Sequence, residues 1–293
     1  MTATNDPAVV LLAHDKPRHL RRLVDALAPL PVFLHVDATV PEAGYRELVG
    51  DLPKRVRLLP RLEAGWGRFE LVEAELSGYR AALKETTAQH LIMMSGADYP
   101  LVSSSTLVEE LSRYRGVSLA QVDPLPIRDW GPLGGYDRFW FRQRPWRRRR
   151  LVLPVPRRVP AELDPAGGSQ MKILSRDDAE LVLSIRDGRP DLMTFFRRCW
   201  IPDEVVIPTI LNSPRLVDRP VRVLGPSRWV INWGSDQGQS PHWLTVADLP
   251  QLREARSRSE AAALFARKFH DDSEQIIQLI DSELRTASRH VAR

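Results

Sequence analysis

Short apolar runs of strand length alternate with segments of helical periodicity through the first third of the chain, and this alternation restricts the fold more than any other feature. Apolar residues recur at helical spacing after Pro17, whereas the apolar runs around that segment are too short for helices. A repeated strand–helix–strand order is typical of an α/β fold with a mostly parallel central sheet and helices on both faces. The expected strands are 8–13, 32–36, 55–59 and 90–94, and the expected helices begin at 17, cover 69–83 and run from Ser103 to about 114.

The pattern changes between about 123 and 168, where Pro, Arg, Trp and Gly are frequent and periodicity is weak. This stretch predicts long loops or an insertion. A second α/β part follows, with strands near 171–174 and 228–232, a helix capped by Ser175 and a helical end. A chain of 293 residues forms one large or two small domains. We expect a single domain, 1–293, with one half at about 8–122 and the other at about 123–293.

Cysteine content and hydropathy indicate the compartment. Cys199 is the only cysteine, which excludes an intramolecular disulfide and a cysteine-based metal cluster, so a reducing compartment is expected. No apolar run approaches 18 residues, and the first residues lack the basic and apolar regions of a signal peptide. We therefore expect a cytoplasmic protein without a transmembrane anchor.

The formal net charge of +5 raises the possibility of a nucleic-acid-binding protein. The densest basic run, RQRPWRRRR, covers Arg142 to Arg150, and elsewhere Arg and Glu are interspersed as on a solvated surface. A net charge of this size fits anionic small substrates equally well, so no nucleic-acid partner is expected. An Arg-rich nucleic-acid binder remains the non-enzymatic alternative.

Several common chemistries lack their motifs. The sequence has no GxGxxG, no GxxxxGK[ST], no HExxH, no CxxC and no GxSxG, which argues against dinucleotide, P-loop, zinc-protease and serine-hydrolase functions. A nucleotide-sugar hydrolase or epimerase would need a nicotinamide site or metal ligands that the sequence does not indicate. The acidic D-x-D tripeptide, with which many sugar-nucleotide transferases hold a metal, is also absent. We expect no metal site and no cofactor.

A series of sequence islands carries a family resemblance over roughly residues 8 to 270. They are LLAHDKPRHLRRLVDAL at 11–27, FLHVDA at 33–38, GWGRFELVEAEL at 65–76, LIMMSGADYPL at 91–101, CWIPDEVVIPTIL at 199–211, SRWVINW at 227–233 and LFARKF at 264–269. In this order they resemble glycosyltransferase family 14, the core-2/I-branching β-1,6-N-acetylglucosaminyltransferases and their peptide O-xylosyltransferase relatives. The resemblance implies a GT-A-like fold, an inverting mechanism, a UDP-sugar donor and catalysis without an essential metal. It makes 8–122 the expected nucleotide-sugar-binding half and 123–293 the expected acceptor and catalytic half. UDP-GlcNAc is the default donor, UDP-xylose or another UDP-sugar is the rival, and a degenerate, inactive homologue is a further alternative.

Glu204 is the expected catalytic residue. Two acids after Pro202 also suit the first turn of a helix, where they gain from the helix dipole. The resemblance favours the catalytic reading, because the family's PDE glutamate is the general base that accepts the proton of the acceptor hydroxyl. Burial beside Trp200 and Phe195 is expected to raise the pKa of Glu204. Asp203 is expected to be a helper or a cap.

Two cations are expected to neutralise the diphosphate leaving group. Arg228 begins the strand RWVINW, and Lys268 is one of only five lysines in the chain. Both match family positions that clamp the diphosphate, and one such preorganised donor is worth roughly 3–4 kcal/mol. Surface charges flanking strands are the alternative, and Arg267 is an adjacent competitor for the role of Lys268.

The remaining donor-site candidates follow predicted strands or precede a helix. They are His14, Asp37, Trp66, Arg68 and Asp98. Ligands in open α/β sheets collect at the carboxyl ends of strands, which favours His14, Asp37 and Asp98, and a helix N-terminus after Trp66 and Arg68 suits an anion. Turn formation by Asp37 and Asp98, and a structural Trp66 with a surface Arg68, are the alternatives.

The acceptor region carries no motif that the resemblance transfers, so the hydroxyl acceptor, a glycan or a small molecule, is unidentified. Trp130, Tyr136, Trp140 and Trp146 are aromatic side chains of the kind that stack on sugars, although packing within a loop explains them equally well. The sequence does not indicate the oligomeric state.

Overall fold

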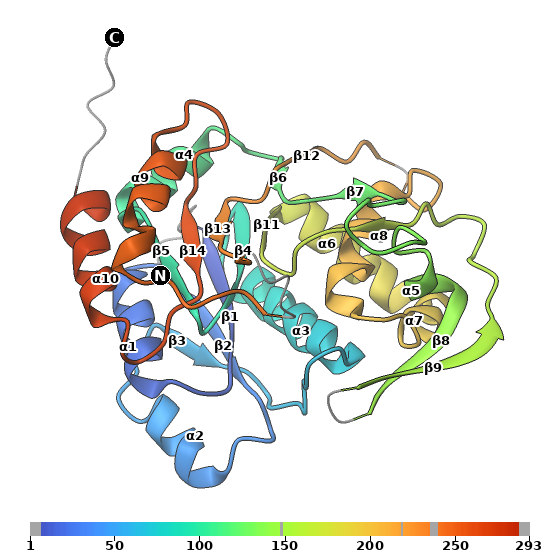
Figure 1. Cartoon of the computed structure of the whole chain (residues 1–293), viewed down its shortest axis with the longest axis horizontal. Helices are drawn as coiled ribbons and strands as arrows, with labels where there is room; N and C mark the ends of the chain where they lie inside the picture. The colour runs from blue at the N-terminus through green and yellow to red at the C-terminus, as the bar shows by residue number, and fades with distance from the viewer. Residues whose placement is uncertain (1–6, 147–148, 218, 235–239, 287–293) are drawn as a thin grey trace.

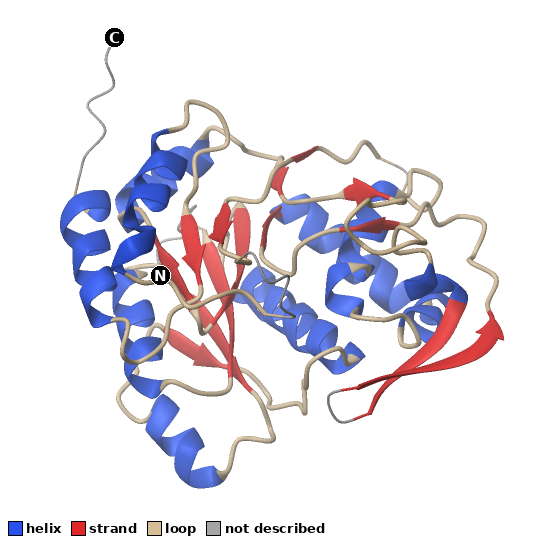
Figure 2. Cartoon of the chain, viewed as in Figure 1, coloured by secondary structure: helices blue, strands red, loops and turns tan. Residues whose placement is uncertain are grey.

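The computed structural model describes residues 7–146, 149–217, 219–234 and 240–286 (Figure 1). A seven-stranded sheet forms its centre, and all its strands are parallel except β11, which is antiparallel to both neighbours. The predicted α/β class with a mostly parallel sheet is confirmed (Figure 2). In spatial order the strands are β12 (Val223–Leu224), β6 (Ser118–Leu119), β11 (Lys172–Ser175), β4 (His90–Ser95), β1 (Ala8–Ala13), β2 (Val32–Val36) and β3 (Val56–Leu58).

Helices cover both faces of this sheet because its central strands are apolar on both sides. Val9 and Leu11 of β1 pack into one core, whereas Val10 and Leu12 pack into the other, as the two-residue period of a strand requires. The first core is closed by α1 (Pro17–Ala26), α2 (Glu42–Val49), α4 (Ser104–Ser112), α9 (Leu249–Ser257), α10 (Glu274–Leu279) and the π-helical turn η3 (Ile280–Arg285). The second core is closed by α3 (Phe69–Glu85), α5 (Asp137–Trp140), α6 (Arg176–Gly188), α7 (Pro190–Phe196) and α8 (Val206–Asn212).

Three smaller sheets and two 3₁₀ turns complete the fold. The three-stranded sheet is ordered β13 (Trp229–Ile231), β14 (Phe265–Arg267) and β5 (Asp98–Pro100), with β13 parallel to β14. The pairs are β7 (Asp123–Pro124) with β10 (Ala166–Gly167), and β8 (Phe141–Trp146) with β9 (Arg149–Pro156). The 3₁₀ turns are η1 (Pro202–Glu204) and η2 (Val246–Asp248).

The prediction of loops between 123 and 168 is wrong for residues 141–156, which form the antiparallel hairpin β8–β9 (Figure 1). Prolines and arginines in these strands hide the two-residue period, because both residue types are expected outside central strands. Residues 147–148 and the side chains of 144–151 lie outside the described part of the structure, so the Arg142–Arg150 run is described only in part.

The two expected halves are not separate layers. The strand β11 inserts between β6 and β4 in the central sheet, and β12 extends its edge, so residues on both sides of 122 build one sheet. The helices α9 and α10 likewise share the first core with α1. In the part of the chain that the structure describes, no helix combines the length and apolar character needed to cross a bilayer.

We define the carboxyl edge as the edge of the central sheet at which β1, β2 and β4 end. Backbone hydrogen bonds join the residues that follow these strands: Asp37 N donates to Ala13 O at 3.0 Å, and Gly96 N donates to Leu12 O at 2.8 Å. The antiparallel strand β11 begins at this edge, because Lys172 pairs with Met93 near the end of β4. Ligand sites of open α/β sheets lie at such edges.

Candidate active site

Glu204 ends the 3₁₀ turn η1, as expected for a helix start at Pro202. Ile201 precedes the turn in the left-handed region, with φ of 48°, and Gly168 N donates to the Glu204 carbonyl oxygen at 2.9 Å. The Glu204 side chain is 30% exposed, and its Oε2 accepts a hydrogen bond from Nη1 of Arg138 at 2.6 Å. The expected burial of Glu204 is therefore only partial, and an arginine holds one of its two oxygens.

The turn η1 lies at the carboxyl edge of the sheet. Lys172, the first residue of β11 at this edge, acts electrostatically on Asp203 of the turn, and Gly168, which binds the Glu204 backbone, leads into the same strand. On the other side, Trp200 contacts Trp66 edge to face, with ring centroids 5.4 Å apart. The loop that carries Trp66 follows β3 and is tied to β2 by a 2.9 Å hydrogen bond from Leu62 N to His35 Nε2.

A buried charge cluster lies behind η1. Lys172 of β11 donates to Oε1 of Glu75 at 2.9 Å, and Tyr79 donates its hydroxyl to the same oxygen at 2.7 Å. The Lys172 and Glu75 side chains are 2% and 0% exposed. The helix α3, which carries Glu75 and Tyr79, packs against η1. We call Glu75, Tyr79, Lys172 and Asp203 the buried cluster.

Asp203 is the buried acid of the PDE segment. Desolvation raises the pKa of Asp203 to about 7, and the negative charges of Glu204 and Glu75 contribute to the increase. Lys172 opposes it, but that ammonium group is already paired with Glu75. The two acids therefore differ in environment: Glu204 is partly exposed beside Arg138, and Asp203 is inside.

A second polar group surrounds Lys268. Its ammonium lies 4.1 Å from the ring centroid of Trp243 and donates to Ser240 Oγ at 2.6 Å, and Lys16 lies 5.0 Å from the same ring. Phe269 N donates to Ala97 O at 2.8 Å, which places Lys268 at the carboxyl edge beside the end of β4. Partial burial and the nearby charges of Arg267 and Lys16 lower the pKa of Lys268. His14, which is exposed, precedes Lys16 by two residues in the turn after β1.

The structure places Arg228 away from Lys268. The strands β13 and β14 are parallel, and Leu264 N donates to Arg228 O at 2.8 Å. Arg228 therefore lies at the end of the pair where both strands start, and Lys268 lies at the end where both strands finish. The four residues from Leu264 to Lys268 span roughly 13 Å of extended chain. The expectation that both cations clamp one diphosphate is therefore not met for Arg228.

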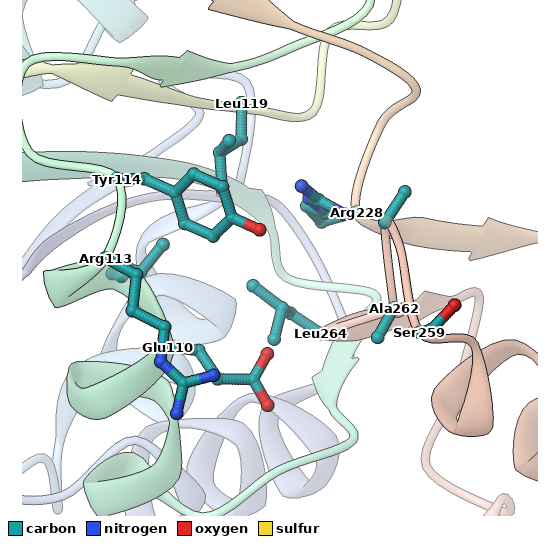
Figure 3. A pocket seen from close by; sticks show the side chains of 10 residues that line it. Glu110, Arg113, Tyr114, Leu119, Arg228, Ser259, Ala262 and Leu264 are labelled. Carbon is teal, nitrogen blue, oxygen red and sulfur yellow. The ribbon is translucent and has the colours of Figure 1, made fainter.

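Arg228 instead lines a small cavity of about 50 Å³ beside α4. Its side chain is directed towards the Tyr114 ring, 5.4 Å from the ring centroid, with Glu110 and Arg113 on the opposite wall (Figure 3). Only 5% of Arg228 is exposed.

Asp98 is not available for a direct donor contact, because its exposed fraction is 0%. Its Oδ2 accepts hydrogen bonds from Ser95 N at 3.0 Å and from the Trp229 indole at 3.1 Å, and Arg267 Nε lies 3.6 Å from Oδ1. Burial raises the pKa of Asp98, and Arg267 opposes this increase. Asp98 thus joins the end of β4 to the β13–β14 pair, and Arg267, the expected competitor of Lys268, is occupied there.

Asp37, Trp66 and Arg68 have protein partners at the same edge. Asp37 Oδ1 accepts hydrogen bonds from the backbone and hydroxyl of Thr39, at 2.8 and 2.6 Å, which is the turn-forming geometry considered as its alternative. Trp66 is 51% exposed despite its contact with Trp200. Arg68 lies 3.5 Å from Glu63 and 3.4 Å from Glu70, so its charge is shared with two carboxylates.

The aromatic acceptor candidates divide into one packed ring and a stacked pair of which only Trp140 is exposed. Trp130 lies beneath the Arg138 guanidinium, 3.5 Å from the ring centroid, and a Cβ atom at Gly167 would come within 2.1 Å of its ring. Tyr136 stacks on Trp140 with centroids 4.9 Å apart, and Trp140 is 38% exposed. Trp130 therefore supports Arg138, and Trp140 presents a ring to solvent.

Sequence reasoning missed Arg138, Lys16, Trp243 and the Glu75–Lys172 pair. Arg138 is 66 residues from Glu204, and Lys172 is 97 residues from Glu75. The available signal for Lys172 was that the chain has only five lysines, and two others, Lys16 and Lys268, lie together at the site. Among the described residues, no three His, Cys, Asp or Glu side chains cluster as metal ligands would.

An open, mostly parallel sheet with polar side chains gathered at its carboxyl edge defines an α/β protein with a ligand site at that edge. The sequence model of the "Core-2/I-Branching enzyme" family matches residues 31–253. The chain belongs to this family of glycosyltransferases.

Curated relatives and solved structures were also compared. Xylosyltransferase 1 of Homo sapiens is 27% identical over 288 residues, covering 89% of this chain and 28% of that protein. Xylosyltransferase 1 of Canis lupus familiaris is 26% identical, with 89% and 29% covered. The chain thus spans less than a third of the length of these relatives. HddC from Yersinia pseudotuberculosis superposes on 60% of this chain and 79% of its own, at a TM-score of 0.30 and 14% identity.

Proposed function

We propose that this chain is an inverting glycosyltransferase of GT-A-like fold that moves a sugar from a UDP-sugar to an acceptor hydroxyl. The observation that carries the proposal is that Glu204 and the Lys268 group lie at the same carboxyl edge of one sheet. An inverting transfer needs a base on one side of the anomeric carbon and a stabilised leaving group on the other. Family membership supports this assignment.

Glu204 acts as the general base in this proposal. Arg138 holds Oε2, and in the described part of the chain no protein group bonds Oε1, which leaves that oxygen for the acceptor hydroxyl. As the hydroxyl oxygen attacks the anomeric carbon, Glu204 takes its proton, and the bond from that carbon to the β-phosphate oxygen breaks. UDP leaves with the electron pair.

Lys268 and Lys16 stabilise the departing diphosphate. Both ammonium groups lie against the Trp243 ring, 4.1 and 5.0 Å from its centroid, and Lys16 is also paired with Asp15, so both cations are held in place before the donor binds. Side-chain cations rather than a metal ion carry this role in the proposal, in line with the absence of a D-x-D tripeptide from the sequence.

The donor sugar is the open part of this function. The resemblance of the sequence islands to the core-2/I-branching N-acetylglucosaminyltransferases favours N-acetylglucosamine, whereas the names of the curated relatives favour xylose. Both donors share UDP, so the nucleotide part of the proposal is common to them. The acceptor is a hydroxyl-bearing glycan or small molecule, and the exposed Trp140 is a candidate for stacking on it.

A thermal-shift screen tests the function. UDP, UDP-xylose, UDP-GlcNAc, UDP-glucose and the GDP and dTDP counterparts are each added in excess chelator. UDP ligands are expected to raise the melting temperature, because a ligand that binds only the folded state stabilises it by mass action. No shift with any UDP ligand, together with salt-sensitive binding of a polynucleotide, would replace the proposal with the nucleic-acid alternative. A shift that requires added manganese would refute the metal-free part.

Lys268→Met is expected to weaken UDP binding about tenfold, or ~1.4 kcal/mol, because it removes a preorganised charge while keeping the contact with Trp243. Arg228→Met is the matched control, since Arg228 lies at the other end of the β13–β14 pair, and its UDP affinity should stay within about twofold. Isothermal calorimetry at a temperature where both variants are folded measures the difference. An equal loss of UDP affinity in both variants would support the original expectation that Arg228 and Lys268 bind the diphosphate together.

A further inference from the structure

The acids of the PDE segment, Asp203 and Glu204, have different surroundings, and among the described residues only Glu204 forms an ion pair with a cation of its own. The Glu204 side chain is 30% exposed and bonded to Arg138, whereas the Asp203 residue is 7% exposed and faces the protein interior. Adjacent carboxylates that share a dry site resist joint ionisation, because each negative charge penalises the other. The question is therefore how the fold accommodates Asp203.

The buried cluster offers Asp203 no free positive charge. Of the elements packed against η1, α3 brings Glu75 and Tyr79, and α8 brings no ionisable side chain. Lys172 of β11 is the cation whose charge acts on Asp203. Lys172 is neutralised by Glu75, to which it donates at 2.9 Å. An ionised Asp203 would thus leave one uncompensated negative charge inside.

The hydrogen-bond inventory of the cluster also lacks a donor. In the described part of the chain, Oδ1 of Asp203 and Oε2 of Glu75 are both buried without a donor. A buried acceptor without a donor is unfavourable, and the protonated form of a carboxyl group supplies an additional O–H donor. One proton in the cluster would therefore remove the excess charge and supply a donor.

We propose that Asp203 is held as the neutral carboxylic acid and acts as a positioning residue that keeps Glu204 the anionic member of the PDE segment. The mechanistic part of this inference rests on the proposed function, in which Glu204 must be ionised to accept a proton. The neutral acid fixes η1 against α3 without adding a second charge behind the base. Ionisation of Asp203 at higher pH would disturb the turn that carries Glu204.

The first test measures stability against pH in Asp203→Asn, which copies the shape of the neutral acid. The raised pKa means that the folded protein keeps this proton over a pH range in which the unfolded chain has lost it, so wild-type stability falls as pH rises from about 4 through the folded pKa. Asp203→Asn has no ionisable group at this position, so it does not show this fall in stability as pH rises. Its melting temperature relative to wild type should rise across that range and then level off.

Glu47→Gln serves as the matched control, because Glu47 is an exposed carboxylate on α2. Its melting temperature relative to wild type should show no such rise. A difference between Asp203→Asn and wild type that is constant from pH 4 to 8.5 would overturn the proposal. If Asp203→Asn fails to fold, infrared spectroscopy with labelled aspartate decides, and Asp98→Asn is measured beside wild type because Asp98 is a second buried aspartate with a raised pKa. A protonated carboxyl band at pH 6 that persists in Asp98→Asn supports the proposal, and its absence refutes it.

Transfer activity gives the mechanistic readout. Asp203→Asn should retain kcat within a few-fold at neutral pH. The proposal predicts that wild-type kcat declines at alkaline pH and that Asp203→Asn lacks this decline, whereas a purely structural role would leave the pH profile unchanged. Complete loss of transfer in a folded Asp203→Asn would overturn the positioning role. If neither protein transfers sugar, the proposed function fails, but the stability and infrared measurements still decide the protonation state of Asp203.

Discussion

Glu204→Gln is expected to lower kcat by about 10²- to 10⁴-fold while leaving UDP binding unchanged, since the general base contributes to the chemical step and not to donor affinity. Glutamine keeps an oxygen that accepts the Arg138 hydrogen bond, so the site should keep its shape. An amide has no basic oxygen for the acceptor proton. Steady-state kinetics with the donor found in the thermal-shift screen measure the loss.

Glu63→Gln is the matched control for this prediction. Glu63 is an exposed acid in the loop before α3, where it pairs with Arg68 at the same edge of the sheet. Its kcat should stay within about twofold of wild type, because a surface ion pair contributes little. Wild-type activity in Glu204→Gln would remove Glu204 from the mechanism, and a lower UDP affinity would indicate a role in donor binding instead.

Lys172→Met should produce the largest loss of stability among the changes considered, about 3–5 kcal/mol, because it leaves the buried Glu75 carboxylate without its cation. For a chain of this size such a loss lowers the melting temperature on the order of 10 °C. Urea unfolding followed by circular dichroism measures the change in the free energy of unfolding. Transfer activity should fall as well, since η1 packs on the helix that carries Glu75.

The double variant Lys172→Met with Glu75→Gln separates charge from packing. It removes both charges and keeps an acceptor for the Tyr79 hydroxyl, so we expect most of the lost stability to return. Arg46→Met, which breaks the exposed pair with Glu42 on α2, should cost less than about 1 kcal/mol. If the single and double variants were equally unstable, the ion pair would not be the source of the loss.

Local sequence was enough to predict the elements whose pattern is periodic and whose ends are marked. The strands β1 and β2 have the expected bounds, and α6 begins after Ser175, whose hydroxyl accepts the backbone N–H of Asp178 as a helix cap. The hairpin β8–β9 was missed because its prolines and arginines resemble those of a loop.

The residues of the candidate site also divide into those that a local motif identifies and those that it does not. The islands around Glu204 and Lys268 were recognisable because each is a short contiguous motif. Their partners were not, because Arg138 and the Glu75–Lys172 pair come together only through contacts between elements far apart in the chain. No local pattern reports such a contact.

The sequence by itself determined the α/β class, the position of most strands and helices, and the PDE segment with its two acids. The tertiary structure alone decided which acid is buried and that β13 runs parallel to β14, which puts Arg228 and Lys268 at opposite ends of that pair. Periodicity and capping act over a few residues, so they can be read along the chain. Burial and strand register depend on distant elements packing together, and this packing gives two neighbouring carboxylates different environments.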